Sequence, residues 1–526
     1  MRRSLLLSLA LLLLVPAAAQ AETITESYRV PTVGGAQVYV EVTRQAGVRS
    51  PVILTYSPYN VLGEGQETQD TYGERYVPRG YARAVADVIG TRNSSGCWDY
   101  GGAAEQQSGV DLVNFLSRRS WSNGKVAMIG GSYDGTTANM VAARGDDARG
   151  LAGVVPIAAI SRWYGYAYSH GVRYSGNSQR PTDEGIDTPL AFDFGFGRTP
   201  PTDPTAIDAA IDRIRPCDAV RHTLEGYNRT PDYDAFWLER DYRKDARRFR
   251  VPALVTHGWQ DFNVKQEEGV ELFKALDGSP FKKLFMFQGG HGSPPDAAFL
   301  PVLDAFFERT LMGRDSGIEA MPAVMTQGRT HAGNDATFRA ETAWPPAGAR
   351  SVTLRLGRSA TGGTLDAAGA GPSASYVDRV AGSEEVPQRA LGAEAQWLTF
   401  QTAPLAADTR IADAPRLLAT VTANRSFGQL VPTLFDVDPT GKAVPITRGF
   451  LNLRYRGGLA RAEAMPVGEP TPVSVTFKNQ DWTVKAGHRI ALVLESSNSA
   501  WAVPDVPGLS LEVASRSSRL VLPVAP

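Results

Sequence analysis

The residue types that could perform nucleophilic chemistry follow one another along the chain as a serine, an aspartate and a histidine. Ser132 stands in the stretch VAMIGGSYDG, residues 126–135. A serine hydroxyl is a weak nucleophile at neutral pH, so it needs a base within hydrogen-bond reach and an acid that orients the base. Asp261 and His291 each follow a later apolar segment. The order Ser132, Asp261, His291 predicts a catalytic triad for acyl transfer.

The chain has six histidines, and all of them follow Ser132. His291 stands in a glycine-rich loop straight after a buried-strand candidate, where an imidazole could reach a serine. His257 ends the preceding strand candidate and precedes Asp261 in the same loop, so we interpret it as a structural histidine hydrogen-bonded at a strand end. The others fall in irregular or all-β parts of the chain: His170, His222, His331 and His488.

The residues around Ser132 predict a strand, a sharp turn and a helix, which is the context of a nucleophile elbow. Small neighbours let the helix pack close behind the serine. The usual spacing is Gly-x-Ser-x-Gly. Here Gly130 fits, but position 134 is Asp, and the next glycine is Gly135. A glycine-rich turn without a catalytic role is the alternative interpretation of this stretch alone.

Elements around this turn alternate between strands and helices. Short apolar segments without polar alternation indicate strands buried on both faces, as in a parallel sheet with crossover helices. Active residues in such sheets lie at the carboxyl ends of the strands. Tyr59, Ser132 and the loop at Gly90 follow such ends. The segments are 51–56, 82–88, 126–131, 151–156, 251–256 and 283–287.

The predicted fold is an α/β-hydrolase sheet with a helical cap insertion, followed by a C-terminal all-β sandwich of jelly-roll type. Regular periodicity weakens after the fourth strand candidate, which indicates the cap. Later, helical patterns give way to short alternating segments separated by turns. The predicted parts are a signal peptide 1–21, hydrolase core 22–160 and 251–318, cap 161–250, and sandwich 319–526.

A tetrahedral intermediate needs two donors for its oxyanion. The backbone N–H of Tyr133, the residue after the nucleophile, is the first candidate. The second donor normally comes from the loop after an early strand, which here is Ser57-Pro58-Tyr59-Asn60. The phenol of Tyr59 could serve, and an aromatic side chain that merely packs at a turn is the alternative.

These motifs resemble a known family. GGSYDG at 130–135 resembles the Gly-x-Ser-Tyr-x-Gly elbow of the Xaa-Pro dipeptidyl-peptidases, a family that includes cocaine-esterase-like enzymes and α-amino-acid ester hydrolases. SPY at 57–59 looks like its oxyanion tyrosine turn, and HGWQDFNVK at 257–265 looks like its acid loop, closest to the dipeptidyl-peptidase branch. Weaker similarities extend through the sandwich, so the resemblance covers nearly the whole mature chain.

The resemblance implies serine acyl transfer to water without a cofactor. The implied substrates are peptides cleaved after an Xaa-Pro dipeptide; an esterase or acylase acting on amino-acid or small aromatic esters and amides is the near alternative. Candidates for an apolar acyl pocket, which could equally be cap packing, are Tyr133, Trp163, Tyr164, Trp259 and Phe262. A peptidase of this type also needs a group for the substrate's α-amine, for which Asp99, Asp183 and Glu184 are open choices.

The overall charge excludes some function classes. The formal net charge is −1 and the pI is about 6.6, with no polybasic run, so nucleic-acid binding has no electrostatic support. Two cysteines, Cys97 and Cys217, allow one disulfide or two separate thiols, and they cannot form a closed zinc site alone. We predict no metal. A homo-oligomer is compatible with the sequence, and a non-catalytic binding protein is the distant alternative.

The N-terminus has the pattern of a secretory signal peptide. Arg2 and Arg3 precede the apolar run Leu5–Val15, and Ala19-Gln20-Ala21 offers small residues for cleavage. This run is short for a membrane span, and no later run reaches the roughly 20 apolar residues that a span needs. We expect an exported protein without a membrane span, periplasmic or extracellular.

Overall fold

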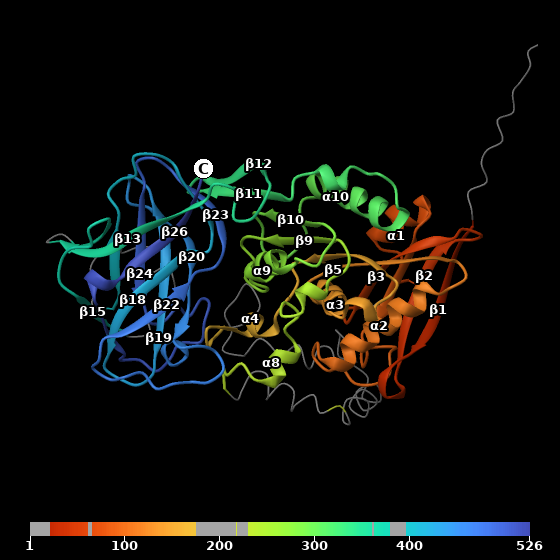
Figure 1. Cartoon of the computed structure of the whole chain (residues 1–526), viewed down its shortest axis with the longest axis horizontal. Helices are drawn as coiled ribbons and strands as arrows, with labels where there is room; N and C mark the ends of the chain where they lie inside the picture. Colours follow the sequence, from red (N-terminus) through yellow and green to blue (C-terminus); the bar gives the residue numbers. More distant parts are fainter. Residues whose placement is uncertain (1–21, 61–65, 175–216, 218–229, 360–361, 379–395) are drawn as a thin grey trace, which may run out of the picture.

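The computed structural model describes residues 22–60, 66–174, 217, 230–359, 362–378 and 396–526. Figure 1 shows two parts side by side. One part is a mixed sheet with helices on both faces, and the other is a stack of β-strands formed by the C-terminal third of the chain.

The central sheet is built from parallel strands with antiparallel strands at both edges. At one edge, β2 (Gln37–Gln45) pairs antiparallel with β1 (Thr23–Pro31) and with β4 (Ala82–Asp87). At the other edge, β12 (Gly333–Glu341) pairs antiparallel with β11 (Val324–Thr330). The parallel strands lie in the order β4, β3 (Ser50–Ser57), β5 (Ser122–Gly131), β6 (Leu151–Ile157), β9 (Ala253–Gly258), β10 (Lys282–Phe287) and β11.

Helices cover both faces of this sheet, which explains why its strands lack polar alternation. Val52 and Leu54 of β3 pack in one cluster, and the intervening Ile53 packs in another on the opposite face. The first cluster receives α2 (Ala103–Ser117), α3 (Tyr133–Ala142) and α9 (Glu267–Ala275). The second receives α10 (Asp296–Phe307) and α1 (Thr71–Tyr76).

Part of the predicted cap lies within the described residues. It comprises α4 (Trp163–Ala167), the short hairpin of β7 (Tyr168–Ser169) and β8 (Val172–Arg173), and α8 (Ala235–Glu239). An antiparallel bridge between Arg162 and Asp241 joins the segment that begins the cap to the segment that ends it. Asp183, Glu184 and His222 lie outside the described residues.

The C-terminal strands enclose a separate apolar core. They are β13 (Arg350–Ser359), β14 (Gly362–Asp366), β15 (Ala374–Val377), β16 (Leu398–Gln401), β17 (Thr409–Asp413), β18 (Arg416–Ala423), β19 (Gln429–Val437), β20 (Ala443–Arg448), β21 (Leu451–Asn452), β22 (Thr471–Thr476), β23 (Gln480–Val484), β24 (Arg489–Glu495), β25 (Ser510–Val513) and β26 (Arg519–Ala525).

The sandwich joins the central sheet directly. Arg329 of β11 pairs in parallel with Trp482 of β23, and Gln480 Nε2 donates to the carbonyl oxygen of Trp259 at 3.1 Å. The strands β11 and β12 belong to the central sheet although they follow residue 319, where the sequence first changes to an all-β pattern. Within the described part of the chain, no helix is long and apolar enough to cross a membrane.

Candidate active site

Ser132 stands on a strained turn between β5 and α3. Its backbone has φ 59° and ψ −120°, and its N–H donates to the carbonyl oxygen of Ile157 at 2.8 Å. A positive φ is uncommon for a residue with a side chain and is found where the surrounding structure imposes it. The turn leaves the serine side chain partly exposed at the carboxyl edge of the sheet.

The two glycines around Ser132 explain the unusual spacing of the motif. A Cβ added to Gly135 would lie 2.7 Å from the carbonyl oxygen of Gly130 and 2.9 Å from the Ile157 nitrogen. A Cβ added to Gly130 would lie 2.3 Å from the Cβ of Asp134. Position 134 therefore tolerates a side chain because Gly130 has none, whereas position 135 must be glycine for α3 to pack on the strand ends.

The predicted acid and base lie in contact. His291 Nδ1 is 2.8 Å from Asp261 Oδ2, and the other carboxylate oxygen accepts the N–H groups of Asn263 at 2.9 Å and Val264 at 3.0 Å. Asp261 is fully buried, whereas the His291 side chain is 27% exposed. Burial by itself would raise the pKa of Asp261, but the hydrogen bonds with His257 and His291 outweigh it and hold the pKa below its usual value.

An ionised Asp261 favours the tautomer of His291 that carries its proton on Nδ1 and leaves Nε2 as a base. Among the described residues, Ser132 Oγ is bonded to Tyr59 rather than to His291. Catalytic hydrogen bonds often tighten only when substrate is bound, so we expect the bond between Ser132 and His291 to form in the substrate complex.

His257 contacts the same carboxylate from inside the fold. Its Nε2 lies 2.8 Å from the carbonyl oxygen of Val264 and 3.3 Å from Asp261 Oδ2, and the residue is 1% exposed. Burial lowers the pKa of His257, but its contact with Asp261 offsets this and leaves the pKa raised. Because solvent and substrate cannot reach this imidazole, it can orient Asp261 but cannot act on a substrate.

The two predicted oxyanion donors lie next to each other beside Ser132. The Tyr59 hydroxyl donates to Ser132 Oγ at 3.2 Å and accepts the backbone N–H of Tyr133 at 3.3 Å. The rings of Tyr59 and Tyr133 are in edge contact with centroids 6.3 Å apart. A carbonyl oxygen bound next to Ser132 could therefore receive both donors, which is the arrangement that stabilises a tetrahedral intermediate.

A buried carboxyl group behind Tyr133 was not foreseen from the sequence. The Tyr133 hydroxyl donates to Glu105 Oε1 at 2.6 Å and accepts from Trp98 Nε1 at 2.7 Å, while Glu105 Oε2 accepts the Gly101 N–H. Burial, with a smaller contribution from the nearby Asp99, raises the pKa of Glu105 to about 8. An acidic residue in the first turn of a helix is ordinarily exposed and interacts favourably with the helix dipole. The sequence therefore contained no sign that Glu105 would be buried beneath Tyr133.

The predicted pocket residues differ in their surroundings. Trp163, Tyr164 and Trp259 are fully buried, and their polar atoms bond to Tyr242, the Pro231 carbonyl and Thr326. Trp163 packs against Tyr133, with ring centroids 5.5 Å apart. Phe262 is partly buried and packs on Trp501 of the sandwich. Their contact with an acyl group stays a prediction.

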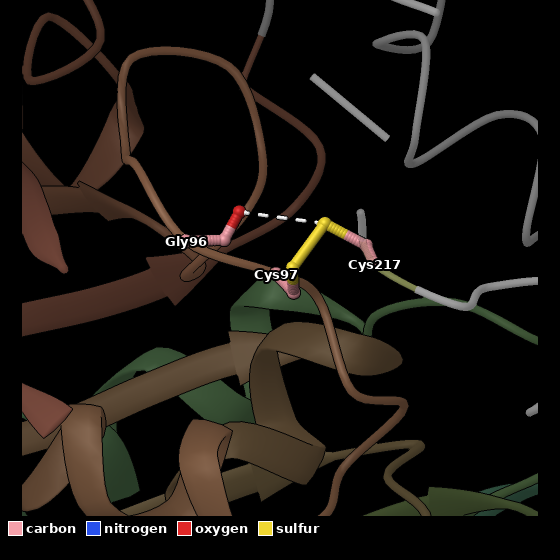
Figure 2. The surroundings of a disulfide bond; sticks show 3 residues. All are labelled: Gly96, Cys97 and Cys217. Carbon is pink, nitrogen blue, oxygen red and sulfur yellow. Dashed lines mark hydrogen bonds between the residues drawn. A yellow bond between two sulfur atoms is a disulfide. The ribbon is translucent and has the colours of Figure 1, made fainter. Parts of the chain in front are cut away.

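The two cysteines form a disulfide, which decides between the alternatives that the sequence left open. Figure 2 shows the bond between Cys97 and Cys217, with Cys217 Sγ near the carbonyl oxygen of Gly96. The bond ties the loop that precedes Trp98 to a residue of the predicted cap. Within the described residues, no group of three or more histidine, cysteine or acidic side chains is placed to hold a metal ion.

Comparison with known proteins agrees with this arrangement. Residues 34–293 match the X-Pro dipeptidyl-peptidase (S15) family, and residues 316–521 match the C-terminal non-catalytic domain of X-Pro dipeptidyl-peptidases. The chain belongs to the X-Pro dipeptidyl-peptidase family. It is a serine hydrolase of that family, and the resemblance inferred from its motifs is confirmed.

Related sequences and solved structures align with most of the chain. A Streptomyces avermitilis protein, provisionally named Xaa-Pro dipeptidyl-peptidase, is 29% identical over 92% of this chain and 79% of its own length. A CocE/NonD family hydrolase from Staphylococcus aureus superposes with a TM-score of 0.75 at 17% identity, covering 96% of this chain and 94% of its own. An α-amino acid ester hydrolase gives 0.72 at 20% identity, covering 97% and 98%. These structures confirm the predicted fold class.

Proposed function

We propose that the protein releases Xaa-Pro dipeptides from the N-termini of peptides, with Ser132 as nucleophile, His291 as base and Asp261 as the acid that orients it. The observation that carries the proposal is the arrangement at the carboxyl edge of the sheet. The Tyr59 hydroxyl lies between Ser132 Oγ and the Tyr133 N–H, and the Asp261–His291 pair lies at the ends of β9 and β10.

In the proposed first step, Ser132 Oγ attacks the scissile carbonyl carbon while His291 Nε2 takes the hydroxyl proton. The carbonyl oxygen becomes an oxyanion that accepts from Tyr59 and from the Tyr133 N–H. Collapse of the intermediate breaks the C–N bond, and the same proton passes from His291 to the leaving amine. A water molecule then attacks the acyl-enzyme in the same way, which frees the dipeptide and restores Ser132.

Labelling with an active-site fluorophosphonate tests the nucleophile. We expect one label per chain, located on Ser132 by mass spectrometry and absent in Ser132→Ala. Ser293→Ala is the matched control, because Ser293 is an exposed serine two residues from His291. A folded wild-type protein that takes no label, or a label that survives in Ser132→Ala, would refute the assignment.

An esterase or acylase with the same site is the second candidate, because one candidate for amine recognition is already engaged. Both carboxylate oxygens of Asp99 accept backbone N–H groups at the start of α2, from Gly102, Ala104 and Glu105. Cleavage of Gly-Pro and Ala-Pro anilides, lost when the substrate amine is acylated, would support the dipeptidyl-peptidase. Cleavage of p-nitrophenyl acetate and butyrate alone would support the esterase.

We also propose that the protein is exported to the periplasm or beyond the cell. The N-terminal pattern of Arg2 and Arg3, an apolar run and Ala19-Gln20-Ala21 supports this, and the Cys97–Cys217 disulfide suits an oxidising compartment. N-terminal sequencing of the protein from its native host should give a start near Glu22. A mature protein that retains Met1 would contradict export by this route.

A further inference from the structure

A cavity of about 190 Å³ lies at the junction of the cap, α9 and the sandwich. Arg162 and Arg243 contribute from the cap, Glu267 and Glu271 from α9, and Lys478 and Asn479 from the sandwich. A cavity lined by this many charged groups is a place for a polar ligand, because buried charges are stable only when paired.

The acidic side chains of the cavity already have cationic partners. Glu267 Oε1 pairs with the buried Nζ of Lys478. Glu271 Oε1 lies 3.0 Å from Nζ of Lys274 and accepts from Asn479 at 3.3 Å. Each acid of the lining thus has a lysine beside it, and Lys274 is shared with Asp413 of the sandwich at 2.7 Å.

Among the described residues, by contrast, neither arginine forms an ion pair at contact distance, although the carboxylates of Glu268 and Asp241 act on Arg162 from farther away. The Nε of Arg162 is buried without a hydrogen-bond partner, and no described carboxylate lies within ion-pair distance of its guanidinium. Only the backbone of Arg243 is bonded, as its N–H donates to Asp241 Oδ1; among the described residues its guanidinium also has no partner. The Arg162 guanidinium also lies over the Tyr164 ring, 5.9 Å from its centroid, a contact that leaves N–H donors of both arginines for a ligand.

Backbone pairing holds the segments that carry these two arginines next to each other. The bridge between Arg162 and Asp241 fixes the two chain segments side by side, two residues from Arg243. The backbone N–H of Arg162 donates to Glu268 Oε2 at 2.8 Å. Two like charges facing one cavity repel each other, and an anion between them removes that repulsion.

His170, which also lines the cavity, is affected by the positive charges around it. The pKa of His170 is lowered to about 4 by burial and by the charges of Lys478 and Arg162. Burial and the nearby Arg243 likewise lower the pKa of Arg162, and together they outweigh the opposing effect of Glu268 and Asp241. A positive field in a largely buried space favours a bound anion.

We propose that this cavity binds a small oxoanion between the guanidinium groups of Arg162 and Arg243. Planar guanidinium groups offer paired N–H donors that match the oxygens of phosphate, sulfate or a carboxylate. The ion would join the cap segments to the junction with the sandwich. Arg162 directly precedes Trp163, which packs on Tyr133, so occupancy would also stiffen the wall behind the proposed oxyanion site.

Calorimetric titration of the mature protein with phosphate, sulfate and acetate tests this proposal, with sodium chloride holding ionic strength constant. We expect one ion per chain and a higher melting temperature with the preferred ion. Preference for phosphate or sulfate would identify a tetrahedral ligand, and preference for acetate a carboxylate; either supports the site. In Arg243→Gln, affinity should fall roughly 10- to 100-fold, as expected for one lost charge-assisted contact.

Arg162→Gln should show the same loss, and Arg243→Gln alone decides the matter if Arg162→Gln does not fold. The matched control is Arg250→Gln, which removes an exposed arginine nearby and should bind as wild type. No saturable binding, or stabilisation equal in wild type, Arg243→Gln and Arg250→Gln, would overturn the proposal, since equal effects indicate a general salt effect. Because Ser132 labelling reports only on the triad, the two tests fail independently.

Discussion

Replacing Tyr59 by phenylalanine removes one oxygen atom from the edge of the sheet where Ser132 lies. That oxygen donates to Ser132 Oγ at 3.2 Å and accepts the Tyr133 N–H at 3.3 Å. The ring itself remains, and with it the edge contact to Tyr133. The substitution therefore tests the phenol as an oxyanion donor while leaving the packing of the turn intact.

The expected loss follows from the number of donors. With Tyr59 and the Tyr133 N–H as a pair, removal of one should lower kcat roughly 10²- to 10³-fold, which is about 2.7–4 kcal/mol of transition-state stabilisation. The hydrogen bonds with Ser132 and Tyr133 that the resting enzyme loses are long and neutral, each worth about 0.5–1.5 kcal/mol net. KM should change little, because the donors act on the charge that develops in the transition state.

The assay compares kcat and KM of wild type and Tyr59→Phe on an anilide and an ester, together with melting temperatures. Tyr28→Phe is the matched control, since it also removes a phenol that donates once, to Glu26, and accepts once, from Trp121, but on edge strand β1 (Figure 1). The Tyr28→Phe enzyme should keep the wild-type kcat. A Tyr59→Phe enzyme with kcat within about threefold of wild type would refute the reasoning, because a lost oxyanion donor has a far larger effect.

Other expectations follow from the same contacts. His291→Ala should lose several orders of magnitude in kcat, while His257→Ala, which removes a buried imidazole, should retain most activity; kinetics showing the reverse would overturn the assignment of the base. Glu105 has a raised pKa, so the folded state holds its proton more tightly than the unfolded chain, and its contribution to stability should fall as pH rises from about 4.5 to about 8. Glu105→Gln should remove that dependence in urea titrations across this range, and an unchanged slope would argue against a buried, protonated carboxyl. Reducing the Cys97–Cys217 disulfide, which spans 120 residues, should destabilise the chain by about 2–5 kcal/mol, seen as a lower melting temperature that Cys97→Ala reproduces without reductant; equal melting temperatures with and without reductant would count against the bond.

The sequence was informative wherever a local pattern had one structural solution. An apolar run of strand length followed by small residues and a helical pattern can place Ser132 only on a strand-to-helix turn, and the structure has β5 and α3 there. Successive strand ends likewise predicted the Asp261 and His291 loops, because parallel strands present their carboxyl ends on one edge. The contact between Asp261 and His291 followed from that order.

The sequence was silent wherever the outcome depended on burial or on distant partners. Glu105 resembles any acidic residue at the start of a helix, and only the packing of α2 against α3 encloses it beneath Tyr133. The pairing of the strands after residue 319 could not be predicted either: β11 pairs with β10 of the central sheet and with β12, and also meets β23 of the sandwich. Alternation within a strand does not say which neighbour it will pair with.

The amino-acid sequence alone determined the order of the chemical groups, the elements that carry them and the family to which the chain belongs. Those properties depend on neighbours within a few residues, whose periodicity and turn preferences are visible in one dimension. Tertiary structure alone decided that Cys97 meets Cys217, that Asp261 touches two imidazoles, and that Arg162 and Arg243 line one cavity. Charge, exposure and pairing are properties of the folded surroundings, since each depends on residues that only the packed chain brings together.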